Sequence, residues 1–438
     1  MLSLHTAHQR RETQGKPRIG LAIAGGGPIG SMYELGALRA LDEAIEGLDL
    51  NRMDCYVGVS SGAFLAAGLA NRIRTDEMCR IFITGDSNDV VFRPSDFMRP
   101  AVAEYLRRAA ALPRIANKWW RDVRRSPWEA GWSSFLMRFG GLVPTGLFDN
   151  TQVEHFLRDV LSRRGRTNDF RKLDVPLYVI AVDLDNGEAV RFGSEQWRDV
   201  PISKAVQASA ALPGLYPPVQ IRGRSFVDGA LRRTMHASVV LDQDIDLLIG
   251  VNPLVPFHAQ GDDEGLEAGA SHSGRLARGG LPAVLSQTFR TLLQSRMQVG
   301  LAKYATQYPN IDQLIFEPNP RDGEMFFTNA FSFSARARIA QMGYRNTLAD
   351  LRRRADTLRP MLEAHGLSLL DDVLNDRHRS ILDGLPPATR DSDATARLRR
   401  ALDEVEERVA RQPAASPARA RTPGTTRSRP ARPRHRPG

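Results

Sequence analysis

The stretch CYVGVSSGAFLAAGLA, residues 55–70, places a glycine-flanked serine between an apolar run and a segment of small residues. The apolar run predicts a buried strand, and the small residues predict a helix that packs closely. Between them GVSSG, Gly58 to Gly62, matches the G-x-S-x-G spacing with Ser60 at its centre. In a nucleophile elbow the serine lies on a tight, strained strand-to-helix turn, so its neighbours must be small. The helix N-terminus then directs N–H groups and partial positive charge at the reaction centre.

A glycine-rich loop precedes this motif, in the stretch AIAGGGPIGSMYELGAL over residues 22–38. Its glycines fit the dinucleotide-binding spacing G-x-G-x-x-G at Gly25, Gly27 and Gly30. A dinucleotide fold needs an acidic side chain at the far end of the second strand, where it holds the ribose hydroxyls. Residues 58–60 occupy that place instead, and Asp54 lies before the strand. The loop is therefore not expected to bind a nucleotide.

The alternative ligand for this loop is the oxyanion of a reacting ester. Loops that follow adjacent parallel strands meet at the same edge of a sheet. The N–H groups of Gly26 and Gly27 can therefore face Ser60 and stabilise negative charge on an attacked carbonyl. A serine nucleophile also needs a base. VDGA, residues 227–230, supplies a candidate in Asp228, at the end of a short predicted strand.

Four motifs stand in the order known from one enzyme family. They are the glycine-rich loop, the elbow, an A-S-x-x-x-P segment and a D-G-[GA] motif, here Gly25–Gly30, Gly58–Gly62, Ala208–Pro213 and Asp228–Ala230. From about Arg18 to Pro253 the chain resembles the patatin-like phospholipases, in particular the bacterial-type patatin-like acyl hydrolases. The resemblance implies a three-layer α/β/α fold with a central, mostly parallel sheet.

The resemblance also implies a mechanism that needs no catalytic histidine, cofactor or metal. In this family a Ser–Asp dyad hydrolyses acyl esters of lipids, which makes Ser60 the nucleophile and Asp228 the proton acceptor. The other implied site positions belong to the oxyanion loop, the elbow and the base motif: Gly25, Gly26, Gly27, Gly30, Gly58, Gly62, Gly229 and Ala230. The chain departs from the family at Ile29, where the loop usually carries an arginine. This departure leaves the head-group preference open.

Strand and helix patterns alternate from Pro17 to Pro253, which favours a parallel sheet covered on both faces. The flanking segments differ in composition, so we expect several parts. These are a flexible leader (1–16), the catalytic domain (17–253) with an insertion (90–150), a mostly helical extension packed on it (254–385), a helix (386–412) and a disordered Arg/Pro-rich tail (413–438).

Two other functions fit parts of the sequence. A Ser–His–Asp esterase has the chain order Ser, acid, His, and His236 follows Asp228 by eight residues. Against it, the serine follows the second strand, whereas α/β-hydrolases place their nucleophile later in the sheet. Replacing His236 by Ala separates a dyad from a triad. A catalytically silent lipid-binding or scaffold protein is the other alternative, and it predicts that Ser60→Ala leaves function intact.

Charge is distributed unevenly along the chain. Residues 411–438 contain eight arginines and no acid, so this segment carries +8 of the formal net charge of +10. It matches no nucleic-acid-binding module, and we expect contact with anionic surfaces only.

The sequence has two cysteines, and its first 16 residues lack an apolar signal region. We therefore expect a cytoplasmic protein that works on a lipid or membrane-surface substrate. The sequence does not indicate an oligomeric state.

Residues 115–139 interleave four tryptophans with basic residues. Such a composition suits a bilayer interface, but it also suits a helical insertion whose tryptophans pack on the core. Both interpretations stay open at this stage.

Overall fold

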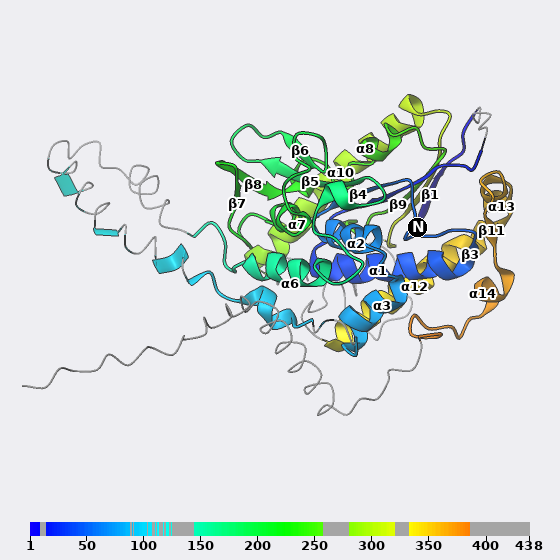
Figure 1. Cartoon of the computed structure of the whole chain (residues 1–438), viewed down its shortest axis with the longest axis horizontal. Coiled ribbons are helices and arrows are strands. Elements are labelled where there is room, and N and C mark those ends of the chain that lie inside the picture. The colour runs from blue at the N-terminus through cyan, green and yellow to red at the C-terminus, as the bar shows by residue number, and fades with distance from the viewer. Residues whose placement is uncertain are drawn as a thin grey trace, which may run out of the picture. The chain divides into compact units, whose positions relative to one another are not determined.

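A mixed β-sheet with helices on both faces forms the centre of the computed structural model (Figure 1). The structure describes residues 1–8, 15–87, 144–256, 280–319 and 333–385, with scattered positions between 90 and 124. The described strands of the sheet are β1 (Leu2–His5), β2 (Ile19–Ile23), β4 (Cys55–Val59), β5 (Leu177–Asp183), β6 (Ala189–Phe192), β7 (Val219–Ile221), β8 (Arg224–Asp228), β9 (Leu247–Val251) and β10 (Asp312–Phe316). Hydrogen-bonded neighbours link the strands in the order β1-β10-β9-β2-β4-β5-β8-β7, and β6 also pairs with β5.

The middle of the sheet is parallel and its margins are antiparallel. The pairs that link β10, β9, β2, β4 and β5 are parallel, whereas β1, β6, β7 and β8 pair antiparallel with their neighbours. Strands buried on both faces have near-continuous apolar sequences, and all five residues of β2 and of β4 are buried. The expected three-layer α/β/α class is confirmed, with a sheet that is mixed overall and parallel at its centre.

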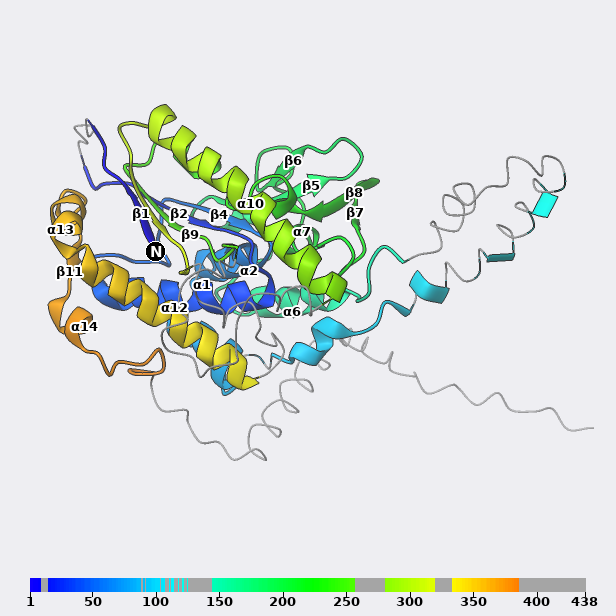
Figure 2. The same cartoon turned by 180° about the vertical axis from the view of Figure 1, so that it is seen from behind.

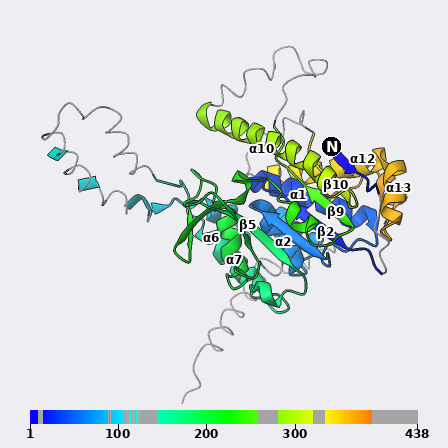
Figure 3. The same cartoon turned by 90° about the horizontal axis from the view of Figure 1, so that it is seen from above.

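Side chains of the central strands alternate between two apolar cores, as the two-residue period of a strand requires. In β4, Tyr56 belongs to one core, while Cys55 and Val57 belong to the other. The first core is covered by α1 (Gly27–Ala44), α2 (Ser61–Ala70), α3 (Thr75–Cys79), α6 (Thr151–Leu161), α7 (Ile202–Ser209), α12 (Phe333–Arg353), α13 (Ala355–Glu363) and α14 (Asp371–Asn375). The second is covered by α8 (Ser238–Leu241) and α10 (Gly280–Gln307). Figure 2 shows α10 running along its face of the sheet, and Figure 3 shows β5, β2 and β9 from above.

Shorter elements complete the described fold. A π-helical turn (Arg80–Thr84) follows α3, and 3₁₀ turns occur at Pro94–Met98, Phe170–Lys172 and Gly229–Leu231. A separate two-stranded sheet pairs β3 (Ile45–Glu46) with β11 (Ser368–Leu369).

The strands β4 and β8 share one edge of β5, and this brings two distant parts of the chain together. Residues 179–180 of β5 pair with both β4 and β6, so these two strands lie on opposite edges. Residues 181–182 pair with both β6 and β8, so β8 lies on the β4 side. Because β4 runs parallel to β5 and β8 runs antiparallel, their C-terminal ends meet. The residues that follow β4 therefore lie next to Asp228, the last residue of β8.

The structure differs from two sequence-based expectations about chain organisation. The flexible leader is wrong for residues 2–5, because β1 pairs with β10 and Leu2 is buried against the core. The boundary at residue 253 does not separate structural units, because β10 pairs in parallel with β9 and extends the same sheet. Three expected parts lie wholly or mostly outside the described residues: the helix at 386–412, the tail at 413–438 and the Trp-rich segment at 115–139.

Candidate active site

Ser60 stands on the strained turn between β4 and α2. Its backbone has φ of 52° and ψ of −120°, a conformation that non-glycine residues rarely adopt. The elbow glycines allow the close approach that this turn needs. A Cβ atom at Gly58 would lie 2.4 Å from Ala63 Cα, and one at Gly62 would lie 2.2 Å from the Ala24 carbonyl oxygen. The turn presents Ser60 at the N-terminus of α2, where the helix dipole favours negative charge.

Asp228 lies within hydrogen-bond distance of Ser60. Ser60 Oγ donates to Asp228 Oδ2 over 2.7 Å, and the Ala230 N–H donates to Asp228 Oδ1 over 2.9 Å. The carboxyl is buried, and burial raises its pKa to about 6, although the hydrogen bonds from Ser60 and Ala230 oppose the rise. Asp228 is therefore mostly ionised at neutral pH and more basic than an exposed aspartate.

Ser209 holds the backbone of Ser60, a contact that the sequence did not reveal. The Ser60 N–H donates to Ser209 Oγ over 2.7 Å, and Ser209 Oγ–H donates to the Ile180 carbonyl over 2.5 Å. Ser209 is the serine of the A-S-x-x-x-P segment at the end of α7. That motif was the available signal, but it indicated no contact with Ser60.

The glycine-rich loop lies against Ser60, but most of its amides already donate hydrogen bonds within the protein. A Cβ atom at Gly25 would lie 3.0 Å from Ser60 Cβ. The Gly25 N–H donates to the Thr234 carbonyl, and the Gly30 N–H donates to the Gly26 carbonyl, each over 3.1 Å. These two glycines therefore shape the loop and do not offer amides to a ligand.

The remaining two loop amides differ from each other. The Gly26 N–H donates to Ser61 Oγ over 2.8 Å. Gly27 begins α1 with φ of 63°, so its amide is among those that have no acceptor inside the helix. The amide of Ser61, the first residue of α2, is in the same situation. Ile29, which replaces the usual loop arginine, packs on the first core.

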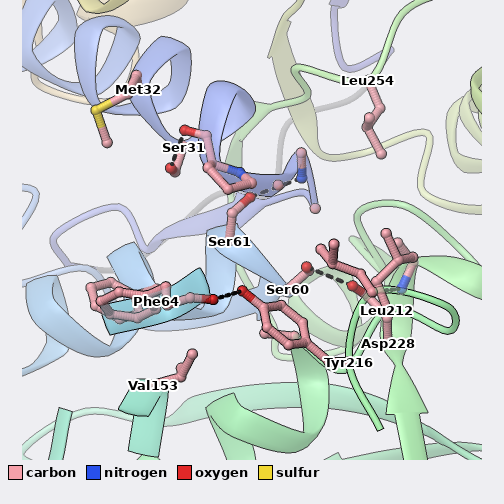
Figure 4. A pocket seen from close by; sticks show the side chains of 18 of the residues that line it. Ser31, Met32, Ser60, Ser61, Phe64, Val153, Leu212, Tyr216, Asp228 and Leu254 are labelled. Atoms are coloured by element: carbon pink, nitrogen blue, oxygen red, sulfur yellow. Dashed lines mark hydrogen bonds between the residues drawn. The ribbon is translucent and has the colours of Figure 1, made fainter. Parts of the chain in front are cut away.

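An apolar cavity of about 270 Å³ opens beside Ser60 and Asp228, and Figure 4 shows these two residues and Tyr216 on its wall. Much of the wall is aromatic, with contributions from Phe64, Phe82, Phe92, Phe97 and Phe289. Two described basic residues also line the cavity, Arg290 of α10 and Arg336 of α12. Burial lowers the pKa of Arg290 to about 10, so its guanidinium remains charged at neutral pH. The cavity can hold an acyl chain and an anionic group.

His236 does not take part in this arrangement. Its ring is buried, and burial lowers the pKa of the imidazole to about 3, so the ring is neutral at physiological pH. Its Nε2 has no hydrogen-bond partner among the residues that the structure describes. The hydroxyl of Ser60 is directed to Asp228.

The family model for patatin-like phospholipases matches residues 21–241. The chain belongs to this family. The matched segment holds the glycine-rich loop, the elbow and the Asp228 motif. Curated relatives include uncharacterized NTE family proteins of Mycobacterium bovis and Mycobacterium tuberculosis, each 26% identical over 229 residues. The alignment covers 51% of this chain, which spans only 28% of the length of these relatives.

Solved structures with low sequence identity also resemble this patatin-like chain. VipD from Legionella pneumophila is 14% identical with a TM-score of 0.37, over 84% of this chain and 72% of VipD. Human GIVD cytosolic phospholipase A2, solved with methyl gamma-linolenyl fluorophosphonate, is 12% identical with a TM-score of 0.27, over 78% of this chain and 59% of that chain. Among the described helices of this patatin-like protein, none has both the length and the apolar character needed to cross a bilayer.

Proposed function

We propose that this protein hydrolyses carboxylic esters of lipids, as a phospholipase A or lysophospholipase does. The carrying observation is the 2.7 Å hydrogen bond from Ser60 Oγ to the buried Asp228, beside an apolar cavity. Family membership supports the same chemistry.

In the proposed reaction, Asp228 accepts the Ser60 proton as Oγ attacks the acyl carbonyl. The carbonyl oxygen becomes negatively charged and lies at the N-termini of α1 and α2, near the amides of Gly27 and Ser61. Collapse of this intermediate breaks the ester bond, and the alcohol leaves with the proton from Asp228. Water then attacks the acyl-enzyme, Asp228 again accepts a proton, and the fatty acid leaves as Ser60 regains its hydrogen.

The cavity supports a lipid as the substrate. Its aromatic wall can bury an acyl chain, and each buried methylene contributes about 0.8 kcal/mol. Arg290 gives the same cavity a positive charge, which favours an ester that also carries a phosphate.

The test of this function is hydrolysis of phosphatidylglycerol and of a short p-nitrophenyl ester by the wild type, Ser60→Ala and Asp228→Asn. We expect hydrolysis by the wild type only. Equal turnover by Ser60→Ala would overturn the assignment of Ser60 as the nucleophile. A wild type that hydrolyses neither ester would leave a lipid-binding or scaffold role. Loss of turnover on removal of the His236 imidazole, in a variant that still folds, would favour the Ser–His–Asp alternative.

We further propose that the protein acts in the cytoplasm at membrane surfaces. In the Trp-rich segment, Trp120 is 52% exposed and the Arg124 guanidinium lies 5.2 Å from its ring centroid. Such a pair suits the bilayer interface. The arginines beyond residue 410 supply an additional attraction to anionic lipid.

Truncation after residue 412 should weaken binding to anionic vesicles at low salt and leave hydrolysis of a short ester unchanged. Equal vesicle binding would exclude the tail from this role.

A further inference from the structure

Ser61 stands between the nucleophile and the oxyanion loop. It follows Ser60 directly, and it lines the cavity. Figure 4 shows its side chain directed away from Asp228. The Gly26 N–H donates a hydrogen bond to Ser61 Oγ over 2.8 Å, so this amide is not available to the substrate. The oxyanion hole, the group of donors that stabilises the charged carbonyl oxygen, therefore needs another donor in place of the Gly26 amide.

Glu34 of α1 holds Ser61 from the other side. Its carboxyl is fully buried, and Glu34 Oε2 lies 3.3 Å from Ser61 Oγ. Glu34 is fully buried and forms no ion pair with the residues that the structure describes, and this burial raises the pKa of its carboxyl well above the usual range. These observations favour the neutral form, which carries one O–H. Glu34 Oε1 has no hydrogen-bond partner within the described part of the chain. The proton is therefore better placed on Oε2, where Ser61 Oγ can accept it.

The hydrogen bonds of Ser61 can then be counted. A hydroxyl oxygen accepts two hydrogen bonds and donates one. In the contact between Ser61 Oγ and Glu34 Oε2, the hydroxyl donates to an ionised carboxyl, whereas a neutral Glu34 with its proton on Oε2 is the donor. With Glu34 neutral, the Gly26 N–H and the Glu34 O–H occupy the two acceptor sites, so the hydroxyl hydrogen of Ser61 is left for the cavity. We propose that Ser61 Oγ–H is a catalytic oxyanion donor to the attacked carbonyl, and that Glu34 is a positioning residue that orients this hydroxyl. The proposal rests on the proposed ester hydrolysis at Ser60.

The experiment measures kcat and KM for a short p-nitrophenyl ester, together with inhibition by a trifluoromethyl ketone that forms an oxyanion on Ser60. Removal of one oxyanion donor typically lowers kcat by about 100-fold to 1,000-fold. We expect Ser61→Ala to lower kcat by about 100-fold with KM little changed, and to weaken the ketone to a similar degree. Ser194→Ala is the matched control, because Ser194 lies outside the cavity and its hydroxyl donates to the Arg191 carbonyl. It should retain wild-type kcat.

Glu34 is tested through its dependence on Ser61. Glu34→Gln keeps a donor to Ser61 Oγ and should retain most activity, whereas Glu34→Leu should lower kcat by about tenfold. In a Ser61→Ala background, Glu34→Leu should change kcat by less than about twofold, since a positioning residue acts only through the group that it orients. A purely structural role would lower kcat in both backgrounds.

Two outcomes overturn the proposal. Wild-type or higher kcat in Ser61→Ala would mean that the released Gly26 amide is the better donor and that Ser61 only blocks it. An equal effect of Glu34→Leu in both backgrounds would remove the positioning role. Failure of the proposed function is distinguishable, because it appears as a wild type that does not hydrolyse esters or as an active Ser60→Ala variant.

Discussion

Replacing Asp228 by Asn separates the catalytic use of this carboxylate from its effect on stability. Asn keeps the shape and can still contact Ser60 Oγ and the Ala230 N–H, but it cannot accept a proton. We expect kcat to fall by at least about 100-fold. In the wild type, kcat/KM should decline below about pH 6 with a slope of one proton, because Asp228 must be ionised to act and its pKa is about 6.

The same pKa predicts a stability change in the opposite direction. The folded-state pKa of about 6 exceeds the ordinary value of 3.8, so the folded protein holds this proton more tightly than the unfolded chain does. The wild type therefore loses stability as pH rises from about 4 to about 6. About 2 pKa units at 1.36 kcal/mol each give about 3 kcal/mol. Asp228→Asn does not titrate and escapes this loss.

The assay is urea unfolding of the wild type and Asp228→Asn at several pH values. We expect the two free energies of unfolding to agree near pH 4 and to differ by up to about 3 kcal/mol at pH 8, with the variant more stable. Asp185→Asn is the matched control, because it removes the carboxyl of an exposed aspartate outside the cavity. A stability difference between wild type and Asp228→Asn that does not change with pH would mean that folding does not raise the pKa of Asp228.

Three other substitutions test separate parts of the site. His236→Asn should retain most of kcat, because the imidazole of His236 is neutral and makes no contact with Ser60 that the site requires. Asn tolerates the φ of 49° at this position, so the variant should fold. Loss of turnover in a folded His236→Asn variant would support a Ser–His–Asp triad instead of a dyad. Arg290→Met should lower kcat/KM for phosphatidylglycerol more than for diacylglycerol, and an equal loss on both lipids would exclude a charge-specific role. Ser209→Ala removes the hydrogen-bond partner of the Ser60 N–H and of the Ile180 carbonyl. The free energy of unfolding should therefore fall by about 1–3 kcal/mol. An unchanged urea midpoint would contradict the role assigned to Ser209.

Local chemistry allowed much of the site to be predicted from the sequence. The expected strand at residues 55–59 matches β4, and the structure places Ser60 on a strained turn after it. These features depend on neighbours in the chain, where glycines and small side chains have direct steric consequences. The motif order also pointed to Asp228, which the structure brings to Ser60.

What the sequence could not show depends on contacts between distant residues. The meeting of β4 and β8 follows from how each pairs with β5, and pairing register is not encoded by either strand alone. The engagement of the Gly26 amide by Ser61 depends on a rotamer and a loop conformation. The strand at residues 2–5 forms because β10, some 310 residues later, offers it a partner edge.

Labelling with a fluorophosphonate probe, followed by mass spectrometry of the labelled peptide, identifies the residue that acts as the nucleophile. We expect a covalent adduct on Ser60 in the wild type, none in Ser60→Ala, and greatly slowed labelling in Asp228→Asn, because an unactivated serine attacks poorly. An adduct on any other residue, or labelling that proceeds at the wild-type rate without the Asp228 carboxylate, would contradict a Ser60–Asp228 dyad.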